Sequence, residues 1–353
     1  MVVIGSDVHK RTHTFVAVDQ AGRQLGEITV KAVPMGHDKA IRWVQERFGG
    51  EVLWAIEDCR HLSARLEIDL LDAGQAVVRV PPKLMAEQRR TARTRGKSDP
   101  IDALAVARAA LREPGLPVAT HDEASREMKL LVDRREDLVG ERTRMINRLR
   151  WHLHRIAAGD PAADPKSKSL KQVSVRRRLA TWLGDRPGID ARLARDILVD
   201  IDRITPVINA LEKELTALVE ARVPQLLGIP GCAALTAAKI AGETAGVTRF
   251  ATEAKYAMHA GVAPIPVWSG RTHGRVRVNK SGNRQLNTAL HRIAITQLQR
   301  PGLGRTYYDK RIAAGDSTTE ALRALKRRLA RVVYQTLKNN PSTAAETLLP
   351  SAA

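Results

Sequence analysis

The stretch "EVLWAIEDCR", residues 51–60, decides the fold. Its first seven residues form a short apolar run that is typical of a buried strand. The run closes on Glu57, and a carboxylate at the end of a buried strand is costly unless a cation meets it. Because successive side chains of a strand alternate between its two faces, Asp58 should point away from the side that Glu57 faces. We therefore expect Glu57, rather than Asp58, to be the functional carboxylate.

The sequence on either side of this run predicts an α/β domain over residues 1–120. Four further strands are expected, and two of them form a hairpin with its turn at Ala21-Gly22. The expected strands are residues 2–8, the two arms of 13–33, 51–57 and 76–80. The expected helices are residues 36–50, 61–74 and 98–111, the last with Ser98 as its N-cap and Pro100 in its first turn.

The composition points to a folded protein with a polyanionic partner. The chain has 353 residues, a formal net charge of +20 and 43% hydrophobic residues. Such a charge favours nucleic acid, whereas aromatic residues at only 3% argue against a protein built on base-stacking platforms. The two cysteines form no metal-spacing pair, and there is neither a signal peptide nor an apolar run of spanning length. These features predict a cytoplasmic protein with no membrane partner.

The middle of the chain, residues 121–225, predicts long helices around a polar linker at 158–174. The second long helix carries an apolar seam with alternating steps of four and three, interrupted by Pro206. The seam consists of Ile197, Ile201, Ile204, Ile208, Leu211, Leu215 and Leu218. Two interpretations stay open: a helical hairpin within the chain, or a coiled coil between two chains. At Pro206 the helix either kinks or restarts with Thr205 as cap.

Four carboxylates from three predicted elements could meet at one end of the sheet. Asp7 ends the first strand, Glu57 ends the fourth, and Asp99 and Asp102 share one face near a helix N-terminus. Such a cluster raises the pKa values of its members unless cations neutralise it, and hard oxygen ligands favour Mg²⁺ or Mn²⁺. Two ions about 4 Å apart suit phosphoryl transfer. Each residue alone also has an ordinary structural explanation, such as the favourable charge of Asp99 at a helix start.

The strings "IGSDVHKRTHTFVAVD", "AIEDCR" and "RTRGKSDPIDALAVARAA" resemble the DEDD transposases of insertion sequences, relatives of the Piv-type DNA invertases. The resemblance covers about residues 1–335. It implies an RNase H/RuvC-like N-terminal domain in which Asp7, Glu57, Asp99 and Asp102 are the four acidic residues and bind two Mg²⁺ or Mn²⁺ ions. It also implies a homodimer that assembles into a homotetramer.

Residues 226–340 predict a third, mainly helical domain with a basic surface, followed by a disordered tail at 341–353. Between Ala254 and Tyr308 there are nine Lys or Arg and no Asp or Glu, a bias that ordinary solvated faces lack. We expect this segment to contact phosphate, with affinity that falls steeply with salt. The segment "LLGIPGCAALTAAKIAGET" resembles a helix-hairpin-helix element, whose turn at Gly231 suits a phosphate, although a plain packing unit has the same pattern.

The nucleic-acid contacts that we predict are basic or turn residues in these two terminal domains. They are Lys10, Arg95, Lys97, Gly231, Arg271, Arg275, Arg277, Lys280, Asn283 and Arg284.

Ser269, in "PIPVWSG", is by composition an ordinary loop serine, because a hydroxyl is a poor nucleophile unless it is activated. The family resemblance assigns it another role. In these recombinases a serine within a "P…SG" segment attacks DNA phosphate and forms a covalent phosphoserine intermediate. Ser281, in "NKSGNRQ", is the competing serine, and spacing alone leaves both open.

The predicted function is an insertion-sequence transposase that cuts and rejoins donor and target DNA. The resemblance further implies a bridge RNA that pairs with both DNAs. Two alternatives remain: a metal-dependent endonuclease or junction resolvase that uses water as nucleophile, and a non-catalytic nucleic-acid-binding protein.

Overall fold

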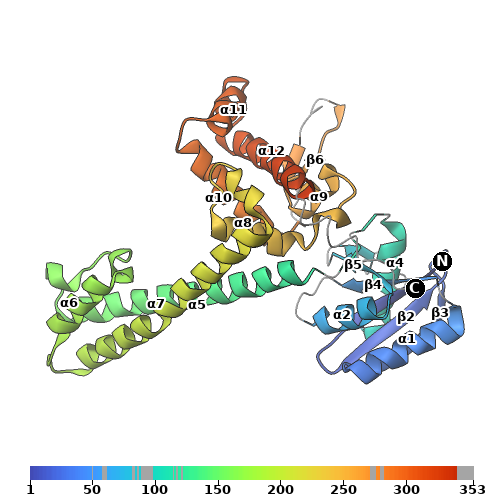
Figure 1. Ribbon diagram of the computed structural model, residues 1–353, viewed down its shortest axis with the longest axis horizontal. Helices are drawn as coiled ribbons and strands as arrows, with labels where there is room; N and C mark the ends of the chain where they lie inside the picture. Colours follow the sequence, from blue (N-terminus) through green and yellow to red (C-terminus); the bar gives the residue numbers. More distant parts are fainter. Residues whose placement is uncertain are drawn as a thin grey trace. The chain divides into compact units, whose positions relative to one another are not determined.

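The computed structural model describes most of the chain and divides it into two compact units. The described residues are 1–49, 51–57, 62–81, 84–85, 87–88, 98–113, 115–116, 118–120, 122–270, 276–278 and 282–339. The first unit combines residues 1–123, 245–287 and 326–338, and the second combines 124–244 and 288–325. Figure 1 labels the helices and strands of both units.

A five-stranded mixed sheet forms the centre of the first unit, as the sequence predicts. Its strands are β1 (Val2–Val8), β2 (Thr12–Val18), β3 (Gln24–Lys31), β4 (Val52–Glu57) and β5 (Ala76–Val80). They lie in the order β3-β2-β1-β4-β5. The neighbours β1, β2 and β3 pair antiparallel, and β4 pairs parallel with both β1 and β5. The RNase H/RuvC assignment of this mixed α/β architecture stays a prediction.

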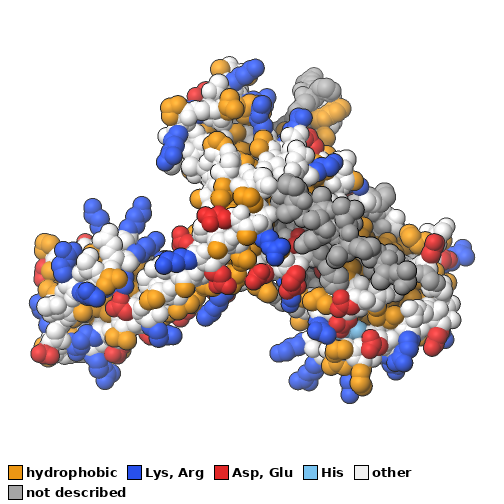
Figure 2. Space-filling model, in the orientation of Figure 1, with side chains coloured by type: hydrophobic (Ala, Val, Ile, Leu, Met, Phe, Trp, Pro, Cys, Tyr) orange, Lys and Arg blue, Asp and Glu red, His pale blue; other side chains and the backbone are white. Residues whose placement is uncertain are grey.

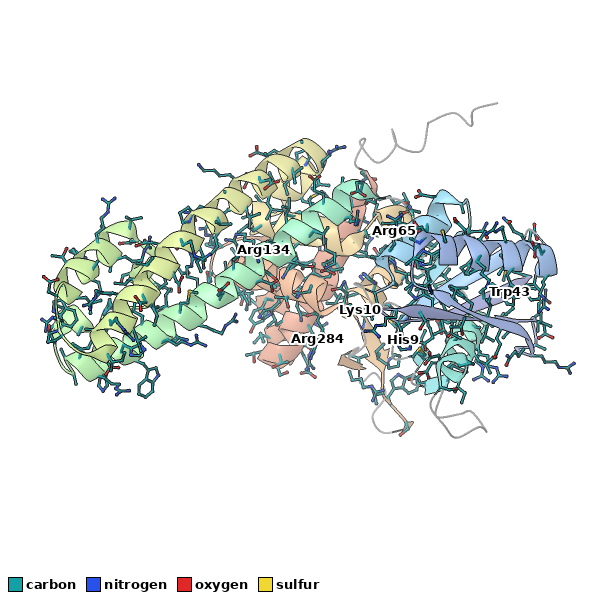
Figure 3. The ribbon with its side chains drawn as sticks, turned by 90° about the horizontal axis from the view of Figure 1, so that it is seen from below. His9, Lys10, Trp43, Arg65, Arg134 and Arg284 are labelled. Atoms are coloured by element: carbon teal, nitrogen blue, oxygen red, sulfur yellow. The ribbon has the colours of Figure 1, made fainter. Side chains whose placement is uncertain are left out.

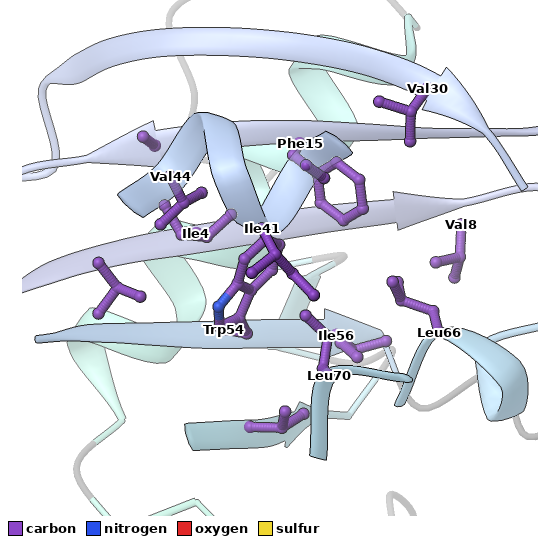
Figure 4. Close-up of a cluster of buried hydrophobic side chains, with 14 of the residues drawn as sticks. Ile4, Val8, Phe15, Val30, Ile41, Val44, Trp54, Ile56, Leu66 and Leu70 are labelled. Atoms are coloured by element: carbon purple, nitrogen blue, oxygen red, sulfur yellow. The ribbon is translucent and has the colours of Figure 1, made fainter. Parts of the chain in front are cut away.

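Helices cover both faces of the sheet, because the strands are apolar on both sides. Helices α1 (Pro34–Phe48) and α2 (Ala64–Asp72) cover one face. The core on that side holds the fully buried side chains of Ile4, Phe15 and Trp54 (Figure 4). Helix α4 (Asp99–Arg112) covers the other face, over the alternate strand residues. Ser98 occupies its N-cap position with extended backbone, although its side chain makes no capping hydrogen bond.

The second unit contains three helices that lie side by side (Figure 1). They are α5 (Glu123–Ile156), α6 (Val173–Leu183) and α7 (Ile189–Arg222), and we call residues 124–222 the arm. Ion pairs tie α5 to α7 in antiparallel alignment: Arg135 to Glu212 at 2.7 Å and His152 to Asp190 at 2.8 Å. At the distal end, leucines and isoleucines of all three helices form one core.

Four of the seven residues of the α7 seam are buried within the single chain, and the other three are half-buried. Ile201, Ile204, Ile208 and Leu215 are each at most 3% exposed in the single chain. This favours the helical hairpin over a coiled coil between chains. Helix α7 runs without a restart and retains Pro206 in its interior.

Residues 158–174, which the sequence predicts to be a linker, also take part in packing. They form two short 3₁₀ turns, at Pro161–Ala163 and Ser169–Lys171. Ala163 and Leu170 belong to the core of the arm. The sequence did not predict this packing, because only two positions are buried in a segment that is otherwise rich in Lys, Ser and Asp.

The rest of the chain is mostly helical, as predicted, with one small sheet that was not. The helices are α8 (Ala234–Thr244), α9 (Glu253–His259), α10 (Arg284–Leu298), α11 (Leu303–Ala313) and α12 (Thr318–Lys338). Strands β6 (Pro264–Pro266) and β7 (Val276–Val278) pair antiparallel. Within the first unit, the Tyr334 hydroxyl donates to the Phe250 carbonyl at 3.0 Å. The predicted tail at 341–353 lies outside the described residues.

Among the residues that the structure describes, no helix is long and apolar enough to cross a bilayer.

Candidate metal centre and nucleic-acid interface

The C-terminal end of β1 presents two side chains to one side of the strand. Asp7 and His9 are two residues apart, so they point the same way along an extended chain. The His9 Nε2 N–H donates to an Asp7 carboxylate oxygen at 3.0 Å. Asp7 is 6% exposed, whereas the His9 side chain is about half exposed. Figure 3 shows His9 at the end of this strand, with Lys10 next to it.

The first turn of α4 brings two more carboxylates to this place. Asp99 is half exposed, and its Oδ1 lies 3.4 Å from His9 Nε2. Asp102, one turn later, is 6% exposed. Helix α4 can lie this close to β1 because residue 5 is a glycine. A Cβ on Gly5 would overlap with the backbone of Ala103 and come within 2.8 Å of the Ala107 Cβ.

The acidic neighbours and the burial both act on the charge of Asp7. Burial is the largest cause that raises the pKa of Asp7 above 3.8, and the negative charges of Asp102 and Asp99 raise it further. The charge and hydrogen bond of His9 lower the same pKa, but they only partly offset the increase. Burial and the neighbouring carboxylates therefore outweigh the favourable charge of His9 at Asp7.

Glu57 lies at the same end of the sheet. The parallel register of β1 and β4 pairs Ser6 with Ile56, so the next step along both strands brings Asp7 level with Glu57. Alternation along β4 puts Ala55 against α4, and Glu57 therefore lies on the α4 side as well. The neighbouring Asp58 lies outside the described residues, so the choice between the two acids stays a prediction.

The donor set at this end of β1 fits a divalent cation. Asp7, His9 and Asp99 each offer one ligand atom, and these atoms all lie within 4.8 Å of one another. Carboxylate oxygens suit Mg²⁺ and Mn²⁺, and an imidazole nitrogen shifts the preference toward Mn²⁺ or another transition metal. The sequence-based prediction missed His9, although "SDVHK" contains the signal, an acid and a histidine two positions apart at a strand end.

Of the ten predicted nucleic-acid contacts, five can be located in the structure. Lys10, Arg277 and Arg284 are exposed, and Figure 3 shows Arg284 at the start of α10. Asn283 has a structural task, because its Oδ1 accepts from the backbone N–H groups of Gln285 and Leu286 at 3.0 Å and so caps α10. The other predicted side-chain contacts lie outside the described residues: Arg95, Lys97, Arg271, Arg275 and Lys280.

Gly231 lies in the turn before α8. The Cys232 N–H donates to the Ile229 carbonyl at 2.9 Å, and Gly231 adopts a φ of 84°, which favours glycine. A cavity of about 740 Å³ opens beside this turn, and α10 contributes His291 and Arg292 to its lining. The turn and the basic side chains of α10 thus line one cavity, and the phosphate contact at Gly231 stays a prediction.

Ser269 lies three residues after the end of β6 and is exposed. Trp268 before it is half exposed, and Gly270 after it has a φ of 44°. A serine on an exposed turn of this kind is accessible to a large substrate. The competing Ser281 lies outside the described residues.

Comparisons with known proteins agree over most of the chain. Residues 4–158 match a family model described as "Transposase", and residues 223–309 match one described as "Transposase IS116/IS110/IS902 family". The chain is 29% identical to a 44.8 kDa protein of insertion element IS116 from Streptomyces clavuligerus, over 95% of this chain and 94% of that protein.

Two further relatives come from other insertion elements. A 42 kDa protein of IS900 from Mycobacterium paratuberculosis is 27% identical over 83% of this chain and 84% of its own length. A 43.6 kDa protein of IS110 from Streptomyces coelicolor is 27% identical over 96% and 94%. The two family models and the near full-length alignments agree, and the chain therefore belongs to the IS116/IS110/IS902 family of insertion-element transposases.

Proposed function

We propose that this transposase cuts and rejoins DNA strands with two groups of residues: an acidic cluster that holds divalent cations, and Ser269 as nucleophile. The cluster comprises Asp7, Glu57, Asp99 and Asp102. The observation that carries the proposal is the meeting of Asp7, His9 and Asp99 within ligand distance of one another, beside the buried Asp102. We add His9 to the proposed site, as a ligand or as the partner that orients the Asp7 carboxylate.

The raised pKa of Asp7 supports a cation site. Burial first, and then the negative charges of Asp102 and Asp99, disfavour ionisation of Asp7, and the imidazole of His9 only partly offsets them. When bound, divalent ions would supply the positive charge that stabilises a phosphate in transit between two oxygens. The residues of this chain would hold those ions, and the apolar contact of α4 with β1 would fix the spacing of their ligands.

The proposed covalent step transfers a phosphoryl group to Ser269. Its Oγ forms a bond to the scissile phosphorus while the bond from phosphorus to the leaving deoxyribose oxygen breaks. The serine hydroxyl loses its proton to water, and the leaving oxygen ends as a hydroxyl. Attack of a DNA hydroxyl on the phosphoserine then rejoins the strand and releases Ser269. Support comes from the exposure of Ser269 next to Trp268 and from the family resemblance of "PIPVWSG".

A trapping experiment tests the nucleophile. The full-length protein is incubated with Mg²⁺ and a nicked donor DNA from which the cut strand diffuses away, and protein–DNA adducts are counted on a denaturing gel. We expect an adduct with the wild type and with Ser281→Ala, and none with Ser269→Ala. An adduct that persists in Ser269→Ala would refute the assignment.

The acidic cluster is tested separately. Asp7→Asn and Asp102→Asn should abolish cleavage and leave DNA binding unchanged. Asparagine has nearly the same shape as aspartate, but it lacks the negative charge that binds a cation. Asp38→Asn, an exposed acid on α1, is the matched control and should cut normally. Unchanged cleavage by both cluster variants would contradict the metal role.

Water as nucleophile is the second candidate, and one observation favours it: the acidic cluster is assembled from residues of β1, β4 and α4, without Ser269. This endonuclease or resolvase activity predicts free 5′-phosphate ends and no adduct in the trapping experiment. A non-catalytic nucleic-acid-binding protein predicts neither product.

We also propose that a bridge RNA guides the enzyme to its donor and target, as the resemblance implies. Support comes from the net charge of +20 with few aromatic residues, which suits recognition of nucleic-acid backbone. Sequencing of the nucleic acid that co-purifies with the protein tests this, and a random mixture of fragments would count against it. Sedimentation analysis of the same sample tests the proposed homodimer and homotetramer.

A further inference from the structure

The outer face of α5 carries a row of four large exposed side chains. Arg144, Arg148, Trp151 and Arg155 follow one another at steps of four, three and four, so they lie on one face of the helix. Trp151 is 70% exposed. We call these four residues the Arg-Trp stripe. At 1.5 Å per residue the stripe is about 16 Å long, enough to follow several nucleotides of a strand.

The arm does not need this face for its own stability. The opposite side of the same stretch of α5 presents Ile146, Leu149 and Leu153, which are at most 3% exposed and form the distal core with α6 and α7. A tryptophan left outside that core exposes a large apolar surface that packing within the chain does not use. Its exposure therefore calls for an explanation outside the fold.

The charge around the stripe is strongly positive. Residues 144–186 contain eleven Lys or Arg and only three Asp. Figure 2 shows Lys and Arg side chains gathered over this end of the second unit. Arg155 pairs with Asp190 at 3.4 Å, but among the described residues Arg144 and Arg148 form no ion pair. Both guanidinium groups are thus available to an anion.

We propose that the Arg-Trp stripe binds a nucleic-acid strand that contains an unpaired base. Arg144, Arg148 and Arg155 contact its phosphates, and the indole of Trp151 stacks on the base. Arginines beside an exposed aromatic ring are the combination by which proteins hold unstacked bases of single strands and loops. The surface is separate from the acidic cluster and from Ser269, and it does not depend on the proposed chemistry.

Two other partners explain the stripe less well. A blunt duplex keeps its bases stacked on one another, so its phosphates would contact the arginines but no base would be free to stack on Trp151. A protein partner would use Trp151 as an anchor, but it would need an unusually acidic surface to meet the exposed arginines and lysines of this segment. The low aromatic content of the chain is consistent with one stacking position in the arm rather than a platform of several.

The test measures binding of the full-length protein without divalent cations, so that cleavage plays no part. The probes are fluorescein-labelled single strands of about 20 nucleotides, as DNA and as RNA, and a blunt duplex of the same sequence. Trp151→Ala should weaken single-strand binding about fivefold to a hundredfold and leave the duplex nearly unaffected. Trp151→Phe should restore most of the loss.

A double variant, R144E/R148E, tests the contribution of charge. This variant should weaken binding of all three probes and reduce the slope of log affinity against log salt by about 0.7 for each lost single-strand phosphate contact. Arg203→Glu is the matched control: it reverses a 68% exposed arginine on α7 of the same arm and should have a much smaller effect. Loss with RNA alone would assign the stripe to RNA, and equal loss with both strands would assign it to either.

Photo-cross-linking locates the contact despite the other basic surfaces of the chain. A strand that carries a single 5-iodouracil should cross-link to the tryptic peptide that contains Trp151. The proposal is overturned if the cross-links map elsewhere and Trp151→Ala, folded by circular dichroism, binds single strands like the wild type. It is equally overturned if Trp151→Ala changes the sedimentation mass while single-strand affinity stays the same, since the stripe would then be a protein interface.

Discussion

Gly5 of β1 and Ala103 of α4 lie in backbone contact, with no room for a side chain between them. This approach carries the first turn of α4, with Asp99 and Asp102, to the end of the strand that bears Asp7. The proposed cation site therefore depends on a glycine that ligates nothing.

Gly5→Ala should damage both the fold and the site. The added methyl meets backbone atoms, which cannot rotate away, so we expect a loss of about 3 kcal/mol in unfolding free energy, at the upper end for overpacking. Displacement of α4 should also weaken Mn²⁺ binding at least tenfold. Urea unfolding and calorimetric titration measure the two effects. Gly228→Ala, where no atom lies within 4 Å of the new methyl, should change neither.

Asp7→Asn should stabilise the cation-free protein at neutral pH. The pKa of Asp7 is raised, so its folded state favours the protonated form, and its contribution to stability is lost as the pH rises through that pKa. The side-chain amide of asparagine does not ionise, so the variant does not lose this stability as the pH rises. We expect a higher Tm for the variant at pH 7 in EDTA and no difference near pH 3.

Added Mn²⁺ should reverse the order of the two proteins in that experiment. The ion stabilises only a folded state that binds it, so it should raise the Tm of the wild type and barely affect Asp7→Asn. A variant that is less stable than the wild type in EDTA at pH 7 would contradict the destabilising role of the Asp7 charge.

His13 should make the protein sensitive to mild acid. It is 2% exposed, stacks on His37 with ring centroids 5.1 Å apart, and has a pKa lowered to about 4, chiefly by burial and then by the charge of His37. A lowered histidine pKa means that stability falls as the pH drops from about 6.5 through 4. The loss should be on the order of 3 kcal/mol, measured by urea unfolding.

The variant His13→Phe should flatten this dependence between pH 6.5 and 4, whatever its stability at pH 7. His154→Gln replaces an exposed histidine of the arm and should retain the wild-type slope. If His13→Phe loses stability with acid as steeply as the wild type does, another group is responsible.

Arg176 should be the polar residue on which the distal arm depends most. It is 2% exposed, and its guanidinium donates to Asp202 at 2.6 Å and to the carbonyls of Leu170 and Lys171 at 3.0 and 2.8 Å. Arg176→Ala leaves buried carbonyls without donors, and we expect a loss of about 3 kcal/mol in thermal or urea unfolding. Arg177→Ala, the exposed neighbour, should stay within about 0.5 kcal/mol of the wild type. A small effect at Arg176 would show that water replaces its hydrogen bonds.

Local patterns in the sequence determined the secondary structure closely. The run "AVVRV" is β5 to the residue, and Gly49 after Phe48 ends α1, because strand alternation and helix termination depend on neighbours in the chain. The family strings pointed to acidic residues that β1, β4 and α4 carry, and the metal role of these residues stays a prediction. The seam of α7 predicted a buried face but not what packs against it. An apolar stripe packs equally well against a helix of the same chain or of another chain.

Only the tertiary structure decided which side chains meet. It buries the α7 seam within one chain, adds Leu170 of the expected linker to the distal core, and puts His9 between Asp7 and Asp99. It also leaves Trp151 70% exposed. Periodicity reports the face of one helix or strand, whereas a site depends on how closely two elements approach, and in this protein a single missing Cβ at Gly5 sets that distance.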